Sequence, residues 1–166
     1  MTDLDQHMSV YKDAITNLCA LIHESGEAAF SHCSTVDQHV WREESKRRRE
    51  LLYLKRQKLI TLREEGDKII YLLTQKGYIR ALKESIIAQQ QQLPEGEANL
   101  VIFDIPEPMS KVRATLRRLL KKAGFTLLQR SVWHGSMDVI DDFRLLVKAL
   151  QAEKYIYIYR VLDEYR

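Results

Sequence analysis

Apolar positions near the start of the chain recur every three or four residues, which is the spacing of one face of a helix. The pattern predicts a helix over residues 8–24 that ends near Gly26, because glycine commonly follows a last helical turn. Residues 27–40 are polar and mixed, and they predict one short helix and a loop. The apolar positions of the first helix are Tyr11, Ile15, Leu18 and Ile22.

The next segment, residues 41–60, combines a narrow apolar seam with many cations. It predicts a helix for which Ser45 is a suitable N-cap, with Leu51 and Leu54 in the seam. Four consecutive cations at the start of a helix repel one another, so an anion such as phosphate would stabilise them. The candidate DNA-binding residues of this helix are Lys46, Arg47, Arg48, Arg49, Tyr53, Lys55 and Arg56.

Two short strand-like runs follow, separated by the sequence EEGD. Residues 60–63 and 68–73 predict a hairpin whose turn has Gly66 at positive φ. Thr74 is the expected cap of a further helix. Two helices, a basic helix, a two-stranded wing and a last helix give the order of a winged helix-turn-helix. In that fold the third helix enters the major groove and the wing contacts the backbone, so Lys68 on the wing is another DNA-binding candidate.

The C-terminal half alternates strand-like and helix-like segments after a polar linker over residues 89–99. The order is strand, helix, a long strand or bent pair, helix and strand, which predicts a ferredoxin-like βαββαβ domain. The fold class is therefore α+β, with a winged helix-turn-helix at residues 1–88 and the ferredoxin-like domain at residues 100–166. The predicted segments of that domain are residues 100–104, 110–123, 125–134, 138–150 and 155–162.

Charge is unevenly distributed along the 166 residues, although the formal net charge is only +3. Residues 1–40 have one lysine and six acidic residues, whereas residues 41–93 have 13 basic and 7 acidic residues. Nucleic acid is the usual partner of such a basic segment, although a helix face exposed to solvent can have the same excess of basic residues. The same two interpretations apply to the cations of the helix predicted over residues 110–123, which include Arg113, Arg117, Arg118, Lys121 and Lys122.

Composition argues against several other classes of protein. No apolar run approaches the 18 or so residues of a membrane span, and the acidic N-terminus lacks the apolar stretch of a secretory signal. Cys19 and Cys33 form no CxxC pair, which fits a reducing cytoplasm. The five histidines show no metal-ligand spacing, so we expect no cofactor.

The run LVIFDIPE at residues 100–107 ends a strand at Asp104. A carboxylate there, beside a basic helix, either belongs to a metal and phosphate site or caps the turn at Pro106. His134 near the same sheet is either a general acid–base group or an exposed strand-end histidine. The last strand is expected to pair across a dimer, because an exposed apolar strand would aggregate. Its shared face has Tyr155, Tyr157 and Tyr159.

This C-terminal motif resembles the small ferredoxin-like CRISPR-associated endonucleases, and more closely the related domain inside PaaX-type repressors. The matching residues are Val101, Ile102, Phe103, Asp104, Ile105, Pro106, Gln129, Ser131, Val132 and Trp133. The basic helix, the wing and the LTQKG sequence at residues 73–77 resemble the winged helix that precedes this domain in PaaX-type repressors. The resemblance covers about residues 41–162 and implies a short, two-domain form without a further effector domain.

The resemblance implies a cytoplasmic DNA-binding transcriptional regulator, a repressor that binds duplex DNA through its winged helix. The ferredoxin-like domain would form a homodimer whose symmetry matches a palindromic operator. The alternative is a CRISPR-associated-type endonuclease in which Asp104 from two protomers holds Mg²⁺, the only cofactor considered. A structural adaptor that bridges DNA is a third interpretation.

Overall fold

The computed structural model describes residues 33–37, 45–66 and 68–162 of the chain. It is a mixed α+β structure, as the sequence predicted. The helix expected over residues 8–24 lies outside the described residues.

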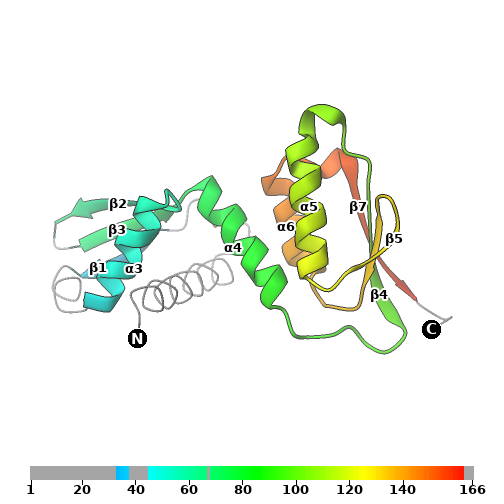
Figure 1. Cartoon of the computed structure of the whole chain (residues 1–166). Coiled ribbons are helices and arrows are strands. Elements are labelled where there is room, and N and C mark those ends of the chain that lie inside the picture. The colour runs from blue at the N-terminus through cyan, green and yellow to red at the C-terminus, as the bar shows by residue number, and fades with distance from the viewer. Residues whose placement is uncertain (1–32, 38–44, 67, 163–166) are drawn as a thin grey trace, which may run out of the picture. The chain divides into compact units, whose positions relative to one another are not determined.

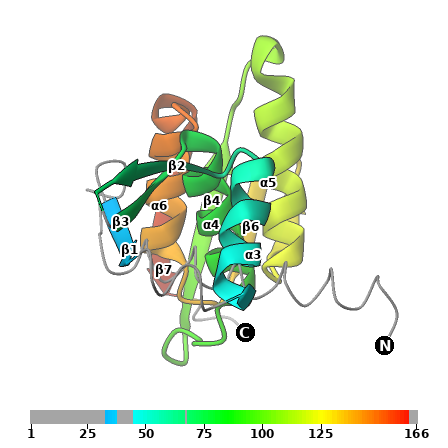
Figure 2. The same cartoon turned by 90° about the vertical axis from the view of Figure 1, so that its left-hand side faces the viewer.

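The chain divides into two compact units, Met1–Ala81 (unit 1) and Leu82–Arg166 (unit 2). Each unit contains one sheet, and Figures 1 and 2 show the two sheets from two directions. The division falls inside helix α4, Gln75–Ala88, and therefore before the polar segment that the sequence predicted as a linker. The units are described separately below.

Unit 1 has a three-stranded antiparallel sheet with the order β1-β3-β2. Its hairpin matches the prediction, because Gly66 in the turn has a φ of 57°. Glycine adopts this left-handed conformation without the steric cost of a Cβ atom. The strands are β1 (Cys33–Asp37), β2 (Ile60–Glu65) and β3 (Lys68–Leu73).

Strand β1 corrects the prediction of a short helix and a loop over residues 27–40, because residues 33–37 form a strand and the rest of that range lies outside the described residues. The run CSTVD has no clear alternation of apolar and polar residues, so its pattern does not identify a strand. Thr35 and Val36 are β-branched and pair with Ile70 and Ile69 of β3. Strand formation depends on such cross-strand neighbours more than on intrinsic preference, and these neighbours are distant in the sequence.

Helix α3 (Ser45–Arg56) precedes the hairpin and α4 follows it, and the predicted cap of α4 is confirmed. The hydroxyl oxygen of Thr74 accepts a hydrogen bond from the Gly77 N–H at 3.0 Å. The hydroxyl lies 2.8 Å from the carbonyl oxygen of Lys58, to which it donates. The cap thus attaches the start of α4 to the chain that leaves α3. The apolar core of unit 1 includes Leu51, Leu54, Leu59, Ile60, Ile70, Tyr71, Leu73 and Tyr78.

Unit 2 follows the predicted order of strand, helix, two strands, helix and strand. The expected long strand or bent pair is a pair of strands, and Gly124, with a φ of 80°, ends the first helix as predicted. The strands form a sheet with the order β5-β6-β4-β7. The elements are β4 (Glu97–Phe103), α5 (Ser110–Lys122), β5 (Thr126–Gln129), β6 (Val132–Gly135), α6 (Ile140–Ala149) and β7 (Ile156–Leu162).

The polar segment before β4 is hydrogen-bonded into unit 2. The Asp138 N–H donates to the Gln91 carbonyl at 2.9 Å, and the Leu93 N–H donates to the Ser136 carbonyl at 2.8 Å. Strand β4 then begins at Glu97, before the predicted start of a strand at Leu100. The polarity of this segment suggested an independent linker, but backbone hydrogen bonds do not depend on side-chain polarity.

Helices α5 and α6 lie along one face of this sheet, and the core of unit 2 fills the space between them (Figure 1). Trp133 and Phe125 are buried in this core. Phe125 packs on Gly135, where an added Cβ atom would lie 2.8 Å from its ring. Other buried residues are Val101, Phe103, Leu116, Leu119, Leu120, Phe143, Leu146, Val147 and Ile156.

Candidate nucleic-acid interface

One side of α3 presents three cations and one leucine to solvent. Leu51 and Leu54 are buried on the opposite side, where the helix packs against β2. At 100° per residue, the four outward positions fall within about 100° of the helix circumference. We call them the α3 face; they are Arg48, Leu52, Lys55 and Arg56.

The cations of the α3 face are available to a ligand. Within the described residues, no ion pair or side-chain hydrogen bond occupies Arg48, Lys55 or Arg56. Leu52 lies among them with 38% of its surface exposed. A single exposed leucine needs no explanation in general, but here it provides an apolar contact inside a cationic surface. Arginine, lysine and apolar groups are the side chains that contact phosphates and the thymine methyl in a DNA groove.

Helix electrostatics separate the two ends of the α3 face. Lys55 and Arg56 in the last turn interact favourably with the negative end of the helix dipole, so they stabilise the helix without any ligand. The first turn has no acidic residue and begins SKRR, which places cations at the positive end of the dipole. Each such cation costs about 0.3–1 kcal/mol when exposed. A bound anion would offset this cost, whereas solvation alone would not favour cations at this end.

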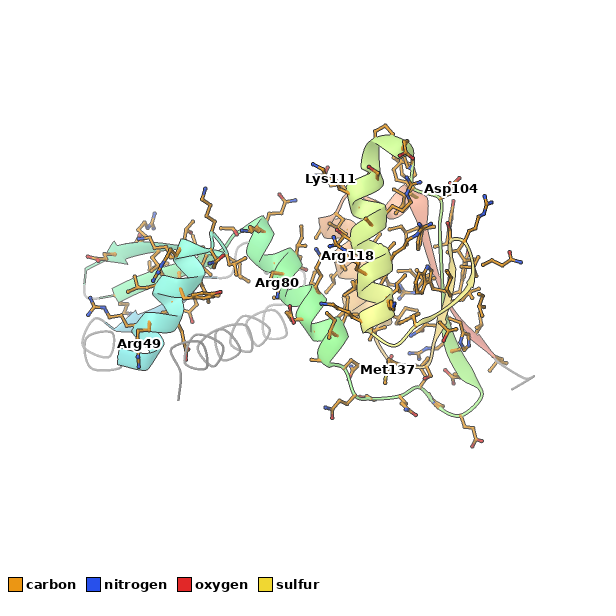
Figure 3. All side chains as sticks on the ribbon, viewed as in Figure 1. Arg49, Arg80, Asp104, Lys111, Arg118 and Met137 are labelled. Carbon is orange, nitrogen blue, oxygen red and sulfur yellow. The ribbon has the colours of Figure 1, made fainter. Side chains whose placement is uncertain are left out.

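The other DNA-binding candidates of α3 differ in their exposure. Lys46 and Arg47 lie within α3, but their side chains are outside the described residues. Arg49 is exposed, and Figure 3 labels it on α3. Tyr53 is half-buried, between the outward and the buried sides of the helix. Leu52 was missed by the sequence analysis, because only the structure shows that this leucine lies outside the seam.

The tip of the β2–β3 hairpin is more acidic than a DNA-contacting wing would be. The DNA-binding candidate Lys68 is exposed there, and it lies opposite Glu65 in the register of the hairpin. Arg63 forms an ion pair with the same carboxylate, and Glu64 is also exposed. Carboxylates repel phosphates, so the hairpin tip is a less favourable surface for an anionic ligand than the α3 face.

Asp104 lies directly after β4, and its side chain is exposed. Its backbone N–H donates to the Tyr155 carbonyl at 2.9 Å, which fixes the chain at the end of the strand. The neighbouring Arg113 is held by Glu107 at 2.6 Å and by the Ile105 carbonyl at 3.4 Å. Figure 3 shows Asp104 at the end of the unit where α5 begins. Asp104 is a single exposed carboxylate, and Mg²⁺ is usually bound by one or two carboxylates together with substrate phosphates.

His134 does not lie beside Asp104. It pairs with Leu100 of β4 and with Thr126 of β5, and its Nε2 atom is buried. Leu100 is four residues from Asp104, which corresponds to about 13 Å along a strand. His134 is therefore too far away to exchange a proton with a group bound at Asp104.

The sheet face opposite α5 and α6 has two lateral rows that contain apolar residues, and the second row also contains His134. Tyr157 pairs with Ile102, which pairs with Val132 on the other side, and Tyr159 pairs with Leu100. Tyr157 and Tyr159 are 53% and 50% exposed. One face of the last strand is therefore uncovered within the described part of unit 2.

The described residues also lack a cluster of metal ligands and a membrane-spanning helix. No three His, Cys, Asp or Glu side chains come close enough to hold a metal ion. No helix in the described ranges has the length and apolar character needed to cross a membrane.

Comparison with known families decides the assignment of unit 2. Residues 93–164 match the model of the PaaX protein central Cas2-like domain. Unit 2 is a PaaX-like domain. The match covers all four strands and both helices of the βαββαβ unit, including the DIP turn at Asp104 and the SVW sequence at residues 131–133. The PaaX resemblance inferred from these motifs is thus confirmed for this part of the chain. No curated protein matches the chain.

Proposed function

We propose that this PaaX-like chain is a DNA-binding transcriptional regulator, a repressor that contacts duplex DNA through α3. The observation that carries the proposal is the α3 face, where Arg48, Lys55 and Arg56 surround an exposed leucine and have no partner in the described residues. A single helix fits the major groove, which is about 12 Å wide. Phosphates would offset the unfavourable placement of cations at the start of α3.

The described elements of unit 1 support a winged helix-turn-helix. A basic helix is followed by an antiparallel hairpin, and a third strand completes the small sheet next to β3. In winged-helix proteins the recognition helix directly precedes the hairpin, and α3 has that position. The PaaX-like domain that follows supports a regulator, and we propose that it has the ferredoxin-like fold.

Duplex binding by the full-length chain tests the proposal. Fluorescence anisotropy with a labelled mixed-sequence duplex at low salt should show binding that weakens as salt increases. The slope of log K against log salt is about −0.9 for each phosphate neutralised, so three cations correspond to a slope of at least about −2.7. Absence of duplex binding at low salt would exclude the proposal.

The acidic hairpin predicts a gain of affinity by mutation. Replacing Glu64 and Glu65 by glutamine removes two negative charges from a segment that lies near the phosphates in a winged-helix complex. We expect duplex affinity to rise about threefold per charge removed at low salt, and the gain to shrink at high salt. The matched control is Glu95→Gln with Glu153→Gln, two exposed acids of unit 2. Equal affinities of the two double variants would mean that the hairpin lies away from the DNA.

We also propose that the PaaX-like domain forms a homodimer through its uncovered sheet face. The two rows of apolar residues on β4, β6 and β7 support this proposal, because exposed apolar patches mark association sites. A twofold dimer would present two copies of α3 to a palindromic operator.

A charge introduced into this face should separate the protomers. We expect the Tyr157→Glu/Tyr159→Glu variant to sediment as a monomer at concentrations where the unmodified chain is a dimer, because burial of four carboxylates per dimer has a large desolvation cost. The control is Ala114→Glu/Gln90→Glu, at exposed positions away from the rows. A dimer that survives the tyrosine changes would place the interface elsewhere.

The alternative function is a Mg²⁺-dependent endonuclease, and the exposed Asp104 at the end of β4 is the observation in its favour. Two copies of Asp104 would have to meet across a dimer to hold the metal. Under our proposal, Asp104→Asn leaves duplex binding unchanged, and the unmodified chain does not cut DNA or RNA when Mg²⁺ is added. Cleavage that disappears in Asp104→Asn would establish the nuclease instead.

A further inference from the structure

Positive charge in the PaaX-like domain is concentrated in one continuous segment. Residues 110–135 contain seven lysines and arginines and no acidic residue. The flanking residues 94–109 contain four acidic residues and no lysine or arginine. Most of the cations of the segment lie on α5, which is cationic in both its first and its last turn. Solubility alone would not require positive and negative charges to be separated into adjacent segments.

Two arginines of α5 are used within the protein. Arg113 binds the Glu107 carboxylate at 2.6 Å. Arg117 donates to the Arg130 carbonyl at 3.3 Å, and its guanidinium lies 6.0 Å from the centre of the Phe103 ring. These contacts connect α5 to the loops at the ends of β4 and β5. Both arginines therefore have a structural role that explains their presence.

The remaining cations of α5 have no comparable role. Within the described residues, no ion pair or hydrogen bond engages the side chains of Lys111, Lys121 or Lys122. Arg118 donates from Nε to the Ala114 carbonyl of its own helix at 3.3 Å, which leaves its terminal nitrogens available. All four side chains are exposed.

Three of these cations form a straight row. Lys111, Arg118 and Lys122 are separated by seven and four residues, so they fall within about 40° of the helix circumference. Their separations along the axis are about 10 Å and about 6 Å. Figure 3 shows Lys111 and Arg118 along the length of α5. We call these three residues the α5 row.

We infer that the α5 row is a second nucleic-acid surface, which binds the phosphate backbone of duplex DNA without reading its sequence. A row of separated cations does not converge on one point, so it suits a polymer of regularly spaced negative charges better than a single small anion. Cations spaced along one line of a helix can contact successive phosphates, and phosphate contacts carry no sequence information directly. This inference rests on the proposed function, because it takes the same duplex as the ligand.

Salt dependence of duplex binding by four full-length variants tests the inference. The α5 row variant is Lys111→Gln/Arg118→Gln/Lys122→Gln. Its control removes the same formal charge from scattered exposed cations of unit 2, namely Arg130→Gln/Arg144→Gln/Lys154→Gln. The third variant neutralises the cations of the α3 face by Arg48→Gln/Lys55→Gln/Arg56→Gln. The fourth combines the α3 and α5 changes.

We expect the α5 row variant to reduce the log–log salt slope by about 2.7, and the scattered control to change it by less than about 1. At low salt, the α3 variant should retain weak duplex binding that the combined variant loses. Equal slopes for the α5 row variant and its control would overturn the inference while leaving the proposed function intact. Failure of the unmodified chain to bind duplex DNA would overturn both. The thermal unfolding of the α5 row variant is measured as a control. An unchanged unfolding temperature shows that a reduced salt slope does not come from misfolding.

Discussion

Neutralising the three cations of the α3 face is expected to abolish measurable duplex binding at physiological salt. The variant Arg48→Gln/Lys55→Gln/Arg56→Gln removes charge-assisted contacts that each contribute upwards of about 1 kcal/mol. Together they correspond to a loss of roughly a hundredfold or more in affinity. These side chains are exposed and have no partner in the described part of unit 1, so their replacement should leave the fold unchanged. Fluorescence anisotropy across a salt series measures the effect.

A control with the same change of net charge separates the α3 face from general electrostatic attraction. Arg130→Gln/Arg144→Gln/Lys154→Gln removes three exposed cations of unit 2, none of which belongs to α3, the β2–β3 hairpin or the α5 row. We expect a loss of less than about tenfold from long-range attraction alone. Comparable losses in the two variants would mean that α3 is not a defined binding surface.

Gly77→Ala is expected to be the most damaging single substitution in unit 1. A Cβ atom at this position would overlap the carbonyl oxygen of Leu59 and lie 2.9 Å from its carbonyl carbon. Both are backbone atoms, so no side-chain rotation relieves the overlap. Leu59 is fixed by its own N–H, which donates to Leu54 at the end of α3, and by Thr74, whose N–H donates to the Leu59 carbonyl. We expect a loss of at least about 3 kcal/mol of stability.

Hydrogen exchange locates this loss. In Gly77→Ala the amides of β2 and β3 should exchange much faster, because the junction that holds α4 beside the hairpin has to open. The control, Lys76→Ala, changes the adjacent exposed position and should cost about 1 kcal/mol or less. If β2 and β3 stay protected in Gly77→Ala, the close packing of α4 on Leu59 contributes little to the stability of unit 1. This junction ends α3, so we also expect Gly77→Ala to weaken duplex binding.

Local signals in the sequence predicted much of the fold. Gly66 and Gly124 mark turns because their positive φ angles are costly for other residues. Thr74 marks the start of α4 because its hydroxyl satisfies an otherwise unpaired N–H. β1 could not be predicted in the same way. Its hydrogen-bonding partner, β3, lies more than 30 residues later in the chain, and no periodic pattern in β1 itself points to that partner.

The sequence identified the helix of the candidate site, and the structure showed which residues of that helix face solvent. The cluster of cations pointed to α3, but only burial shows which positions face solvent, and so Leu52 was overlooked. On α5 the sequence could not distinguish Arg113 and Arg117 from Arg118 and Lys122. The difference depends on Glu107, Phe103 and Arg130, whose positions follow from tertiary packing. The separation of His134 from Asp104 likewise follows from strand register, which no local sequence pattern specifies.

Photo-crosslinking from position 52 tests the central claim most directly. Replacing Leu52 by the photoreactive residue p-benzoylphenylalanine places the reactive group in the middle of the α3 face. Irradiation in the presence of a labelled duplex should give a covalent protein–DNA adduct, and the same replacement at exposed Leu127 of β5 should give none. A protein that binds the duplex but gives no adduct from position 52 would contradict the account, because its DNA-binding surface would then lie away from α3.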